Sequence, residues 1–161
     1  MEKIEKEKLY RSILQSIEHK LLQIEDITAR KIYMIVIDQL STIPYFNWTG
    51  IYLLNKEKNE LVLDYYVGKP TEHTHIPVGR GICGSAVVDK TDKIVEDVTK
   101  EDNYLACSLE TRSEIVVLIR NKTEIIGQID VDSDDIAIFD KTDQNYLRQV
   151  SELIVEKLQN L

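Results

Sequence analysis

A β-hairpin is predicted by the stretch EIVVLIRNKTEIIGQIDVD, which covers residues 114–132. Two runs rich in Ile and Val, residues 114–120 and 124–132, flank polar residues 121–123, as is typical of two strands and their turn. Successive side chains of a strand point to opposite faces, so every second residue shares a face. One face of this hairpin is therefore wholly apolar. It carries Ile115, Val117, Ile119, Ile125, Gly127, Ile129 and Val131.

The length of the turn decides which residues of the hairpin face one another. A three-residue turn places Glu114 opposite Asp130, whereas a two-residue turn sets Glu114 against the apolar face. We therefore expect the three-residue turn, which brings Glu114, Asp130 and Asp132 together as an acid cluster. Unpaired carboxylates repel, so the cluster implies a cationic partner such as an ammonium group. The alternative is a solvated strand end.

The acids also match the start of a calcium-binding loop. Asp130, Asp132 and Asp134 have the spacing of its first three ligand positions. However, Asp135 stands at the required glycine, and Lys141 stands where a bidentate glutamate is needed. We predict no calcium loop here.

Helices are predicted on both sides of this β-rich region. Apolar residues recur at helical spacing over residues 3–24, 27–41 and 141–159. Asp26 is the expected N-cap of the second helix, and Thr142 or Asp140 that of the last. Strands are expected at 48–54, 60–67 and 94–95, a turn at 76–81, a short helix at 82–89 and a long loop at 99–113. This order predicts an α+β fold with a central antiparallel sheet and N-terminal and C-terminal helices packed on one face.

Length and charge restrict the class of protein. The 161 residues fit one domain, 1–161, with N-terminal helices at 1–41 and a core at 47–160. A net charge of −8 makes nucleic acid and anionic membranes poor partners. The apolar stripe of the first helix is too wide to face solvent, so we expect a homodimer formed through the helices.

Two cysteines, Cys83 and Cys107, are too few for a disulfide scaffold or a four-ligand zinc site. With no apolar signal peptide before them, they should be reduced thiols in the cytoplasm. Cys83 lies among small and apolar residues, which is typical of a buried thiol. Cys107 lies in the polar loop and is the better candidate for a reactive thiol. We predict no metal centre and no bound cofactor.

Several segments along the chain form a specific combination of motifs. They are Asn47-Trp48-Thr49-Gly50-Ile51-Tyr52, Ile76-Pro77-Val78-Gly79-Arg80-Gly81-Ile82-Cys83-Gly84, Glu96-Asp97-Val98, Leu105-Ala106-Cys107, Ser113-Glu114-Ile115-Val116 and Ile126-Gly127-Gln128-Ile129-Asp130-Val131-Asp132-Ser133, followed by Phe139, Asp143 and Leu147. This combination resembles the GAF domain family, and more closely its free methionine-(R)-sulfoxide reductase branch. The similarity covers about residues 47–150 and implies a GAF-like fold.

The resemblance implies a role for individual residues. Cys107, which follows Leu-Ala, corresponds to the nucleophile that attacks the sulfoxide. Trp48 and Tyr52 correspond to aromatic residues around the methyl-sulfoxide end of the substrate. The acid cluster corresponds to carboxylates that hold the ammonium group of the free amino acid. The implied reaction leaves a cysteine sulfenic acid, which an external reductant such as thioredoxin or a small dithiol restores, in repair after oxidative stress.

One departure from the family pattern affects the recycling step. His73 stands where the family commonly has a resolving cysteine, and Cys83 matches a secondary cysteine that is a possible resolving thiol. Ser108 and Tyr104 replace an acid and a histidine that are frequent at those positions.

Two other classes of function remain open. A non-catalytic GAF domain that binds a small ligand as a sensor would use the N-terminal helices for dimerisation and signalling. A remnant fold that serves as a dimeric scaffold is the third reading.

Overall fold

An antiparallel sheet of six strands lies at the centre of the part of the chain that the computed structural model describes, residues 1–105 and 108–161. The strand order is β3-β2-β1-β6-β5-β4, so the predicted hairpin, β5–β6, is flanked on both sides. The elements in chain order are α1 (Lys3–Gln23), α2 (Ala29–Leu40), β1 (Trp48–Asn55), β2 (Glu60–Val67), β3 (His75–Pro77), α3 (Gly81–Asp89), β4 (Lys93–Val95), the 3-10 helix η1 (Val98–Lys100), β5 (Ser113–Asn121), β6 (Glu124–Ser133) and α4 (Lys141–Gln159). The predicted α+β class is confirmed.

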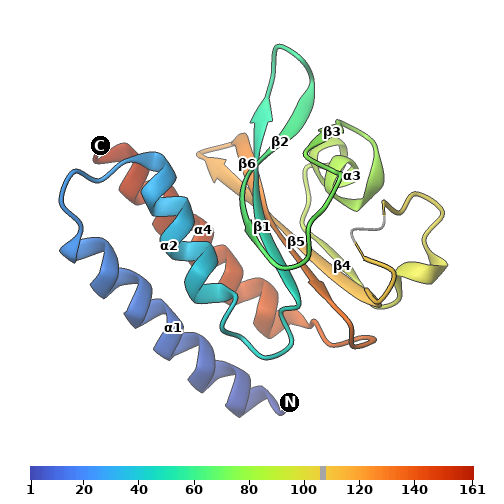
Figure 1. The fold of residues 1–161 in the computed structure, drawn as a ribbon, viewed down its shortest axis with the longest axis horizontal. Coiled ribbons are helices and arrows are strands. Elements are labelled where there is room, and N and C mark those ends of the chain that lie inside the picture. The colour runs from blue at the N-terminus through green and yellow to red at the C-terminus, as the bar shows by residue number, and fades with distance from the viewer. Residues whose placement is uncertain (106–107) are drawn as a thin grey trace.

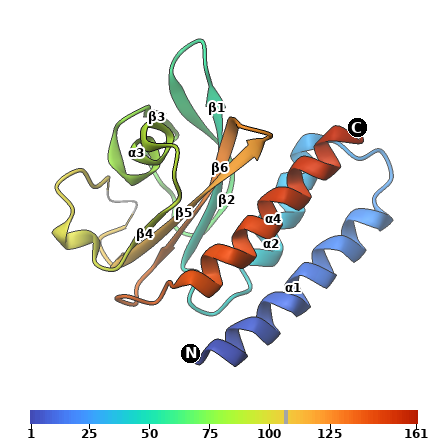
Figure 2. The same ribbon diagram turned by 180° about the vertical axis from the view of Figure 1, so that it is seen from behind.

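The helices divide between the two faces of the sheet (Figures 1 and 2). Helices α2 and α4 pack on one face, the helix face, and α1 lies outside them against both. Helix α3 packs on the opposite face, which we call the α3 face. The predicted packing of the N-terminal and C-terminal helices on one side is therefore confirmed. Ile115, Val117, Ile129 and Val131 all point into the core beneath these helices, as their alternation predicts.

The register of the β5–β6 hairpin differs from the predicted one. Glu114 lies opposite Asp132, not Asp130, and the turn has two residues instead of three. A two-residue turn was expected to place Glu114 on the apolar face. It does not, because a bulge after Ile119 adds one residue to β6 and brings the side chains of the two strands back to matching faces. The pairing differs from the predicted one by two positions, and a shift by two keeps every side chain on its own face. The acid cluster therefore forms in spite of the wrong register.

Two local predictions are corrected. Residues 76–81 were expected to be only a turn, but His75–Pro77 forms the edge strand β3 beside β2; a strand this short leaves no alternation to detect. Helix α2 begins at Ala29, because Thr28, and not Asp26, accepts the capping hydrogen bond from the backbone of Lys31. Asp140 is confirmed as the N-cap of α4.

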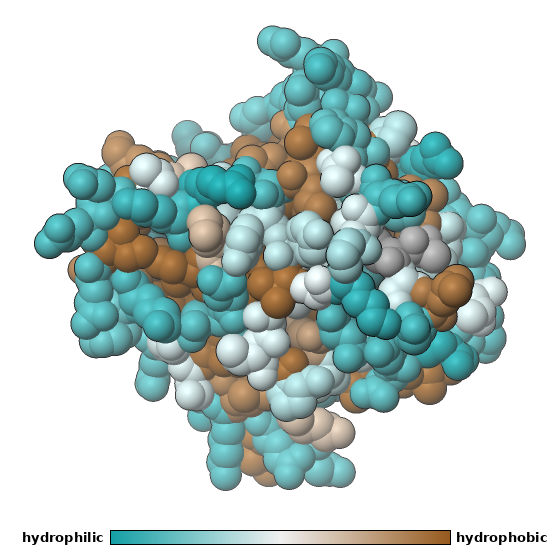
Figure 3. All heavy atoms as spheres, in the orientation of Figure 1, coloured by the Kyte–Doolittle hydropathy of each residue, from teal (hydrophilic) through white to brown (hydrophobic). Residues whose placement is uncertain are grey.

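The apolar stripe of α1 is buried within the chain. Tyr10, Ile13, Ile17 and Leu21 pack into the same core as α2 and α4. The stripe needs no second chain to cover it, so it no longer argues for a homodimer, which stays a prediction. On the face seen in Figure 3, apolar side chains form separate areas between hydrophilic ones. Among the described residues, we find no helix that combines the length and the apolar character needed to cross a bilayer.

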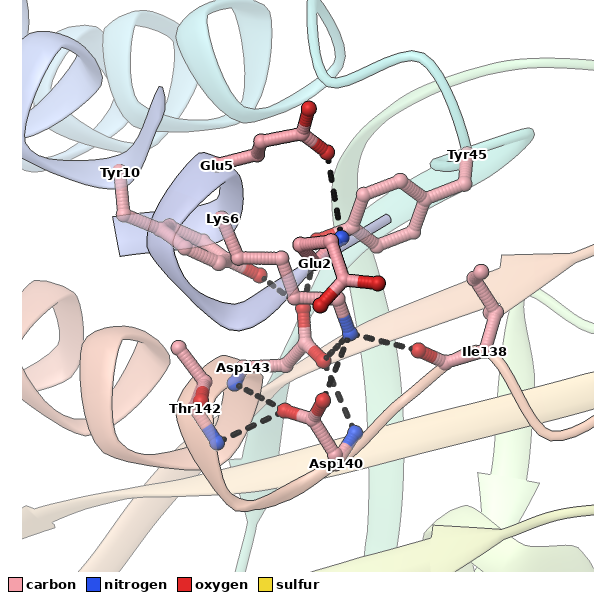
Figure 4. Close-up of polar contacts among 9 residues, drawn as sticks. All are labelled: Glu2, Glu5, Lys6, Tyr10, Tyr45, Ile138, Asp140, Thr142 and Asp143. Atoms are coloured by element: carbon pink, nitrogen blue, oxygen red, sulfur yellow. Dashed lines mark hydrogen bonds and ion pairs between the residues drawn. The ribbon is translucent and has the colours of Figure 1, made fainter. Parts of the chain in front are cut away.

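A buried ion pair joins α1 to the start of α4 (Figure 4). Lys6 Nζ lies 2.6 Å from Asp143 Oδ2 and 3.1 Å from Asp140 Oδ2. The hydroxyls of Tyr10 and Tyr45 each donate to Asp143 Oδ1 at 2.7 Å. Lys6 and Asp143 are only 1% and 0% exposed. Their charges therefore depend on each other, and α1 is held to α4 by a polar contact as well as by apolar packing.

Replacing Lys6 by Met should lower the free energy of unfolding by about 3–5 kcal/mol, because Asp143 would keep a buried charge without its ammonium partner. Urea unfolding followed by circular dichroism measures the change. Lys8→Met is the matched control, since Lys8 lies on the same helix and is exposed, and it should leave stability nearly unchanged. Equal losses in the two variants would contradict the role of the ion pair.

Candidate functional site

The acid cluster lies on the α3 face, at the paired ends of β5 and β6. Glu114 and Asp132 face each other across the two strands, and Asp130 lies two residues along β6. Trp48 of β1 lies opposite Asp132 on the other side of β6. The three acids are 4% (Glu114), 1% (Asp130) and 1% (Asp132) exposed. The alternative of a solvated strand end is therefore wrong, and the predicted gathering of these acids is confirmed.

The environment of the acid cluster disfavours full ionisation. Burial, and then the neighbouring charges of Asp130 and Asp132, raises the pKa of Glu114 well above its usual range. Burial likewise raises the pKa of Asp130. Within the described part of the chain, no lysine or arginine forms an ion pair with Glu114 or Asp130. The cluster therefore retains protons that an incoming cation could displace.

Cys83 of α3 lies against the acid cluster. Its Sγ is 3.8 Å from Glu114 Oε1. Burial, and then the charges of Asp130 and Glu114, raises the pKa of this thiol well above its ordinary value. The predicted burial of Cys83 is confirmed, and its surroundings are the opposite of those that activate a thiol. The next residue, Gly84, lets α3 pack closely against the end of β3, since a Cβ there would lie 2.7 Å from the carbonyl oxygen of Pro77.

A small cavity lies between α3 and the sheet. Its free space is about 10 Å³, enough for roughly one water molecule. Leu105 belongs to its wall, as does His73, the residue at the position of the family's resolving cysteine. An amino acid therefore enters only if the wall opens. The described residues that line the cavity are His73, Ile76, Gly81, Ile82, Cys83, Leu105, Glu114 and Asp130.

The two predicted aromatic residues lie beside this cavity. The hydroxyl of Tyr52 donates to the carbonyl oxygen of His73 at 2.7 Å. The ring of Trp48 stacks on Tyr66, with 5.4 Å between the centroids. Trp48 also borders a second pocket of about 90 Å³, which Ser108 lines as well. The structure therefore places Trp48 opposite Asp132 and at the second pocket, and it places Tyr52 against His73, a residue of the cavity wall.

The predicted nucleophile, Cys107, lies outside the described residues. The residues described on either side of this gap are Leu105 and Ser108. Leu105 lines the cavity that contains Cys83, and Ser108 lines the pocket beside Trp48. The assignment of Cys107 rests on the sequence.

Known proteins are similar to this chain over most of its length, although no protein-family model matches it. GAF domain-containing protein A of Dictyostelium discoideum is 44% identical over 109 residues, which is 68% of either chain. The chain belongs to the GAF domain family.

Within the GAF family, the similarity extends to one branch of enzymes. The free methionine-R-sulfoxide reductase of Escherichia coli is 42% identical over 104 residues, 65% of this chain and 61% of that protein. The X-ray structure of the free methionine-R-sulfoxide reductase from Neisseria meningitidis, in complex with its substrate, matches with a TM-score of 0.85 and 33% identity. The match covers 93% of this chain and 88% of that one. These similarities place the chain in the free methionine-R-sulfoxide reductase branch of the GAF family.

Asn103 is a residue near the site of this GAF domain that the sequence did not indicate. Its Oδ1 accepts a hydrogen bond from the backbone N–H of Gly81 at 2.9 Å, and its Nδ2 donates to Ser85 Oγ at 2.9 Å. A third bond runs from Nδ2 to the carbonyl oxygen of Gly79 at 3.2 Å. Asn103 thereby ties the loop before Leu105 to the first turn of α3. One polar residue in a polar loop gives no signal of this, because its partner Gly81 is 22 residues away.

Replacing Asn103 by Ala should speed amide hydrogen exchange at Gly81 by about fivefold, since one hydrogen bond of roughly 1 kcal/mol is lost there. Exchange measured by NMR gives the ratio. Ser85→Ala is the matched control, because it removes a different bond of Asn103 and leaves the one to Gly81 in place. Unchanged exchange at Gly81 in Asn103→Ala would mean that Asn103 does not hold the loop.

Proposed function

We propose that this protein is a free methionine-R-sulfoxide reductase and that Cys107 is its nucleophile. The observation that carries the proposal is the buried acid cluster, of which Glu114 and Asp130 line a small cavity, in a chain similar to reductases of this name. A buried group of carboxyls without a described lysine or arginine at Glu114 or Asp130 calls for a cationic ligand.

The acid cluster explains a preference for a free amino acid. The ammonium group of free methionine-R-sulfoxide carries the positive charge that two ionised carboxylates can pair with. The nitrogen of a peptide-bound residue carries no charge and cannot replace it. Trp48 and Tyr52 supply apolar surface next to the cluster, which suits the methyl-sulfoxide end of the substrate.

The reaction needs one thiolate and one proton donor. The Cys107 thiolate attacks the sulfoxide sulfur while Glu114, whose raised pKa keeps it protonated, supplies a proton to the departing oxygen. The sulfur–oxygen bond of the substrate breaks, the oxygen ends as a hydroxyl group on the Cys107 sulfur, methionine leaves, and Cys107 is a sulfenic acid. The substrate sulfur is reduced by two electrons and the cysteine sulfur is oxidised by two.

The sulfenic acid is returned to a thiol by an external reductant. Cys83 is a poor attacking thiol because burial and two acids raise its pKa, and His73 replaces the usual resolving cysteine. A small dithiol or a thioredoxin-like protein attacks instead, releasing water, and its second sulfur frees Cys107. The need for this reductant agrees with a reducing compartment such as the cytoplasm, where the enzyme repairs oxidised methionine under oxidative stress. A homodimer formed through the helices remains part of the proposal.

Replacing Asp132 by Ala should raise KM for free methionine-R-sulfoxide by roughly ten- to hundred-fold, because a charge-assisted contact worth about 1.5–3 kcal/mol is lost. A coupled assay with a small dithiol measures it. Asp134→Ala is the matched control, since Asp134 is an exposed acid two residues away, and its KM should stay unchanged. An unchanged KM in Asp132→Ala would remove this acid from the site.

Cys83→Ser should release one equivalent of methionine per enzyme and should keep turning over with a small dithiol. Cys107→Ser should lose both activities, because it lacks the attacking sulfur. Single-turnover product counting on the two variants measures this. If Cys83→Ser stops after one equivalent with dithiol present, Cys83 is the resolving thiol. Binding of the sulfoxide by the unmodified protein without any turnover would instead support a sensor.

A further inference from the structure

The cavity beneath α3 gathers three side chains that can ligate a metal ion. Cys83 Sγ, a carboxylate oxygen of Glu114 and one of Asp130 all lie within 4.8 Å of one another, and all three residues are buried. They come from α3, β5 and β6, so three separate elements aim their ligand atoms at one point. The proposed reaction uses Glu114 as a proton donor. It does not explain why the sulfur of Cys83 lies beside the carboxylates of Glu114 and Asp130.

Two further observations indicate that a cation fits there. Asp130 is 1% exposed and lines the cavity, yet its Oδ1 has no hydrogen-bond partner among the residues that the structure describes. The cavity has free space for about one water molecule, which suits the water ligand of an ion held between the three side chains. A buried oxygen without a donor is costly, and an ion in contact with it would remove that cost.

The distances suit a tetrahedral site. With metal–sulfur and metal–oxygen bonds of about 2.3 and 2.1 Å, a tetrahedral ion holds its sulfur and oxygen ligands about 3.6 Å apart. The observed separation between Cys83 Sγ and Glu114 Oε1 is 3.8 Å. The other two separations, from Asp130 to Cys83 and to Glu114, are at most 4.8 Å.

The ligand atoms, one sulfur and two carboxylate oxygens, indicate which metal ion the site would bind. Calcium and magnesium take oxygen ligands, whereas a thiolate with carboxylates suits zinc. The three ligand residues are one fewer than a structural zinc site with four protein ligands requires. Three protein ligands and a water molecule nevertheless form the open type of zinc site.

We propose that Cys83, Glu114 and Asp130 bind one Zn²⁺ ion. On binding, the Cys83 thiol and the Glu114 carboxyl group each lose a proton to solvent, and the sulfur and the carboxylate oxygen then ligate the ion. The ion and its water ligand fill the cavity, and the ion engages two members of the acid cluster, Glu114 and Asp130. If the cluster holds the substrate ammonium, which rests on the proposed function, zinc is also a competitive inhibitor of the reductase.

Metal binding can be measured without any enzymatic assay. Isothermal titration calorimetry with ZnCl₂ should show one site per chain, and Co²⁺ should produce the near-ultraviolet absorption of a cobalt–thiolate bond. Cys83→Ser should lose that absorption and weaken zinc binding at least about 100-fold, more than the loss of an outer-shell partner costs. Cys107→Ser, the matched control, should keep both. Circular dichroism verifies that both variants fold.

Loss of the cobalt absorption and weak zinc binding in Cys83→Ser, with both kept in Cys107→Ser, support the site. Absence of zinc binding, loss of binding in Cys107→Ser or any other combination overturns it. Asp130→Asn, which keeps the shape of the side chain, should also weaken zinc binding, and unchanged affinity there overturns the ligand set. Reductase activity of the metal-free protein tests the proposed function separately. An active enzyme without zinc affinity refutes only the metal site, and a zinc-binding protein without activity refutes only the reductase.

Discussion

The alternation of side chains along β5 and β6 forces carboxyl groups into the interior, and the rest of the structure depends on that constraint. Ile115, Val117 and Ile129 must face the helices, because they form the core beneath α2 and α4. Because side chains alternate along a strand, the residues next to them in the sequence, Glu114 and Asp130 among them, face α3. The strands cannot turn Glu114 or Asp130 towards water without exposing the apolar face. The packing of the helix face therefore forces the burial of these carboxyl groups, which is electrostatically unfavourable.

The chain buries acids in two different ways. Asp143 is surrounded by an ammonium group and two tyrosine hydroxyls, so its charge is balanced within the fold. Asp130 is equally buried, but it keeps an oxygen that no described residue donates to. The ion pair at Asp143 is balanced by groups of the chain itself, and it holds α1 in place. The arrangement at Asp130 is complete only when a cation or a proton arrives, which distinguishes a binding site from a structural ion pair.

The same electrostatics separate the roles of the two thiols. Acids surround Cys83 and raise the pKa of its thiol, so this thiol is a weaker attacking group than an ordinary cysteine. His73 lines the cavity at the position where the family commonly has a resolving cysteine. Asn103 bonds to Gly81 and Leu105 lines the cavity, so the chain before residue 106 is anchored at the cavity wall.

The sequence by itself determined the α+β class, the helices, the face of each strand residue and the gathering of the acid cluster. These follow from periodicity, which is a local property of the chain. It did not determine the pairing of Glu114 with Asp132, because a bulge leaves no mark in an apolar pattern. Only the tertiary structure decided that Cys83 lies against Glu114, that Lys6 meets Asp143 and that Asn103 holds Gly81. Each of these contacts joins residues far apart in the chain, and their distance is set by how helices and loops pack on the sheet, which no local pattern encodes.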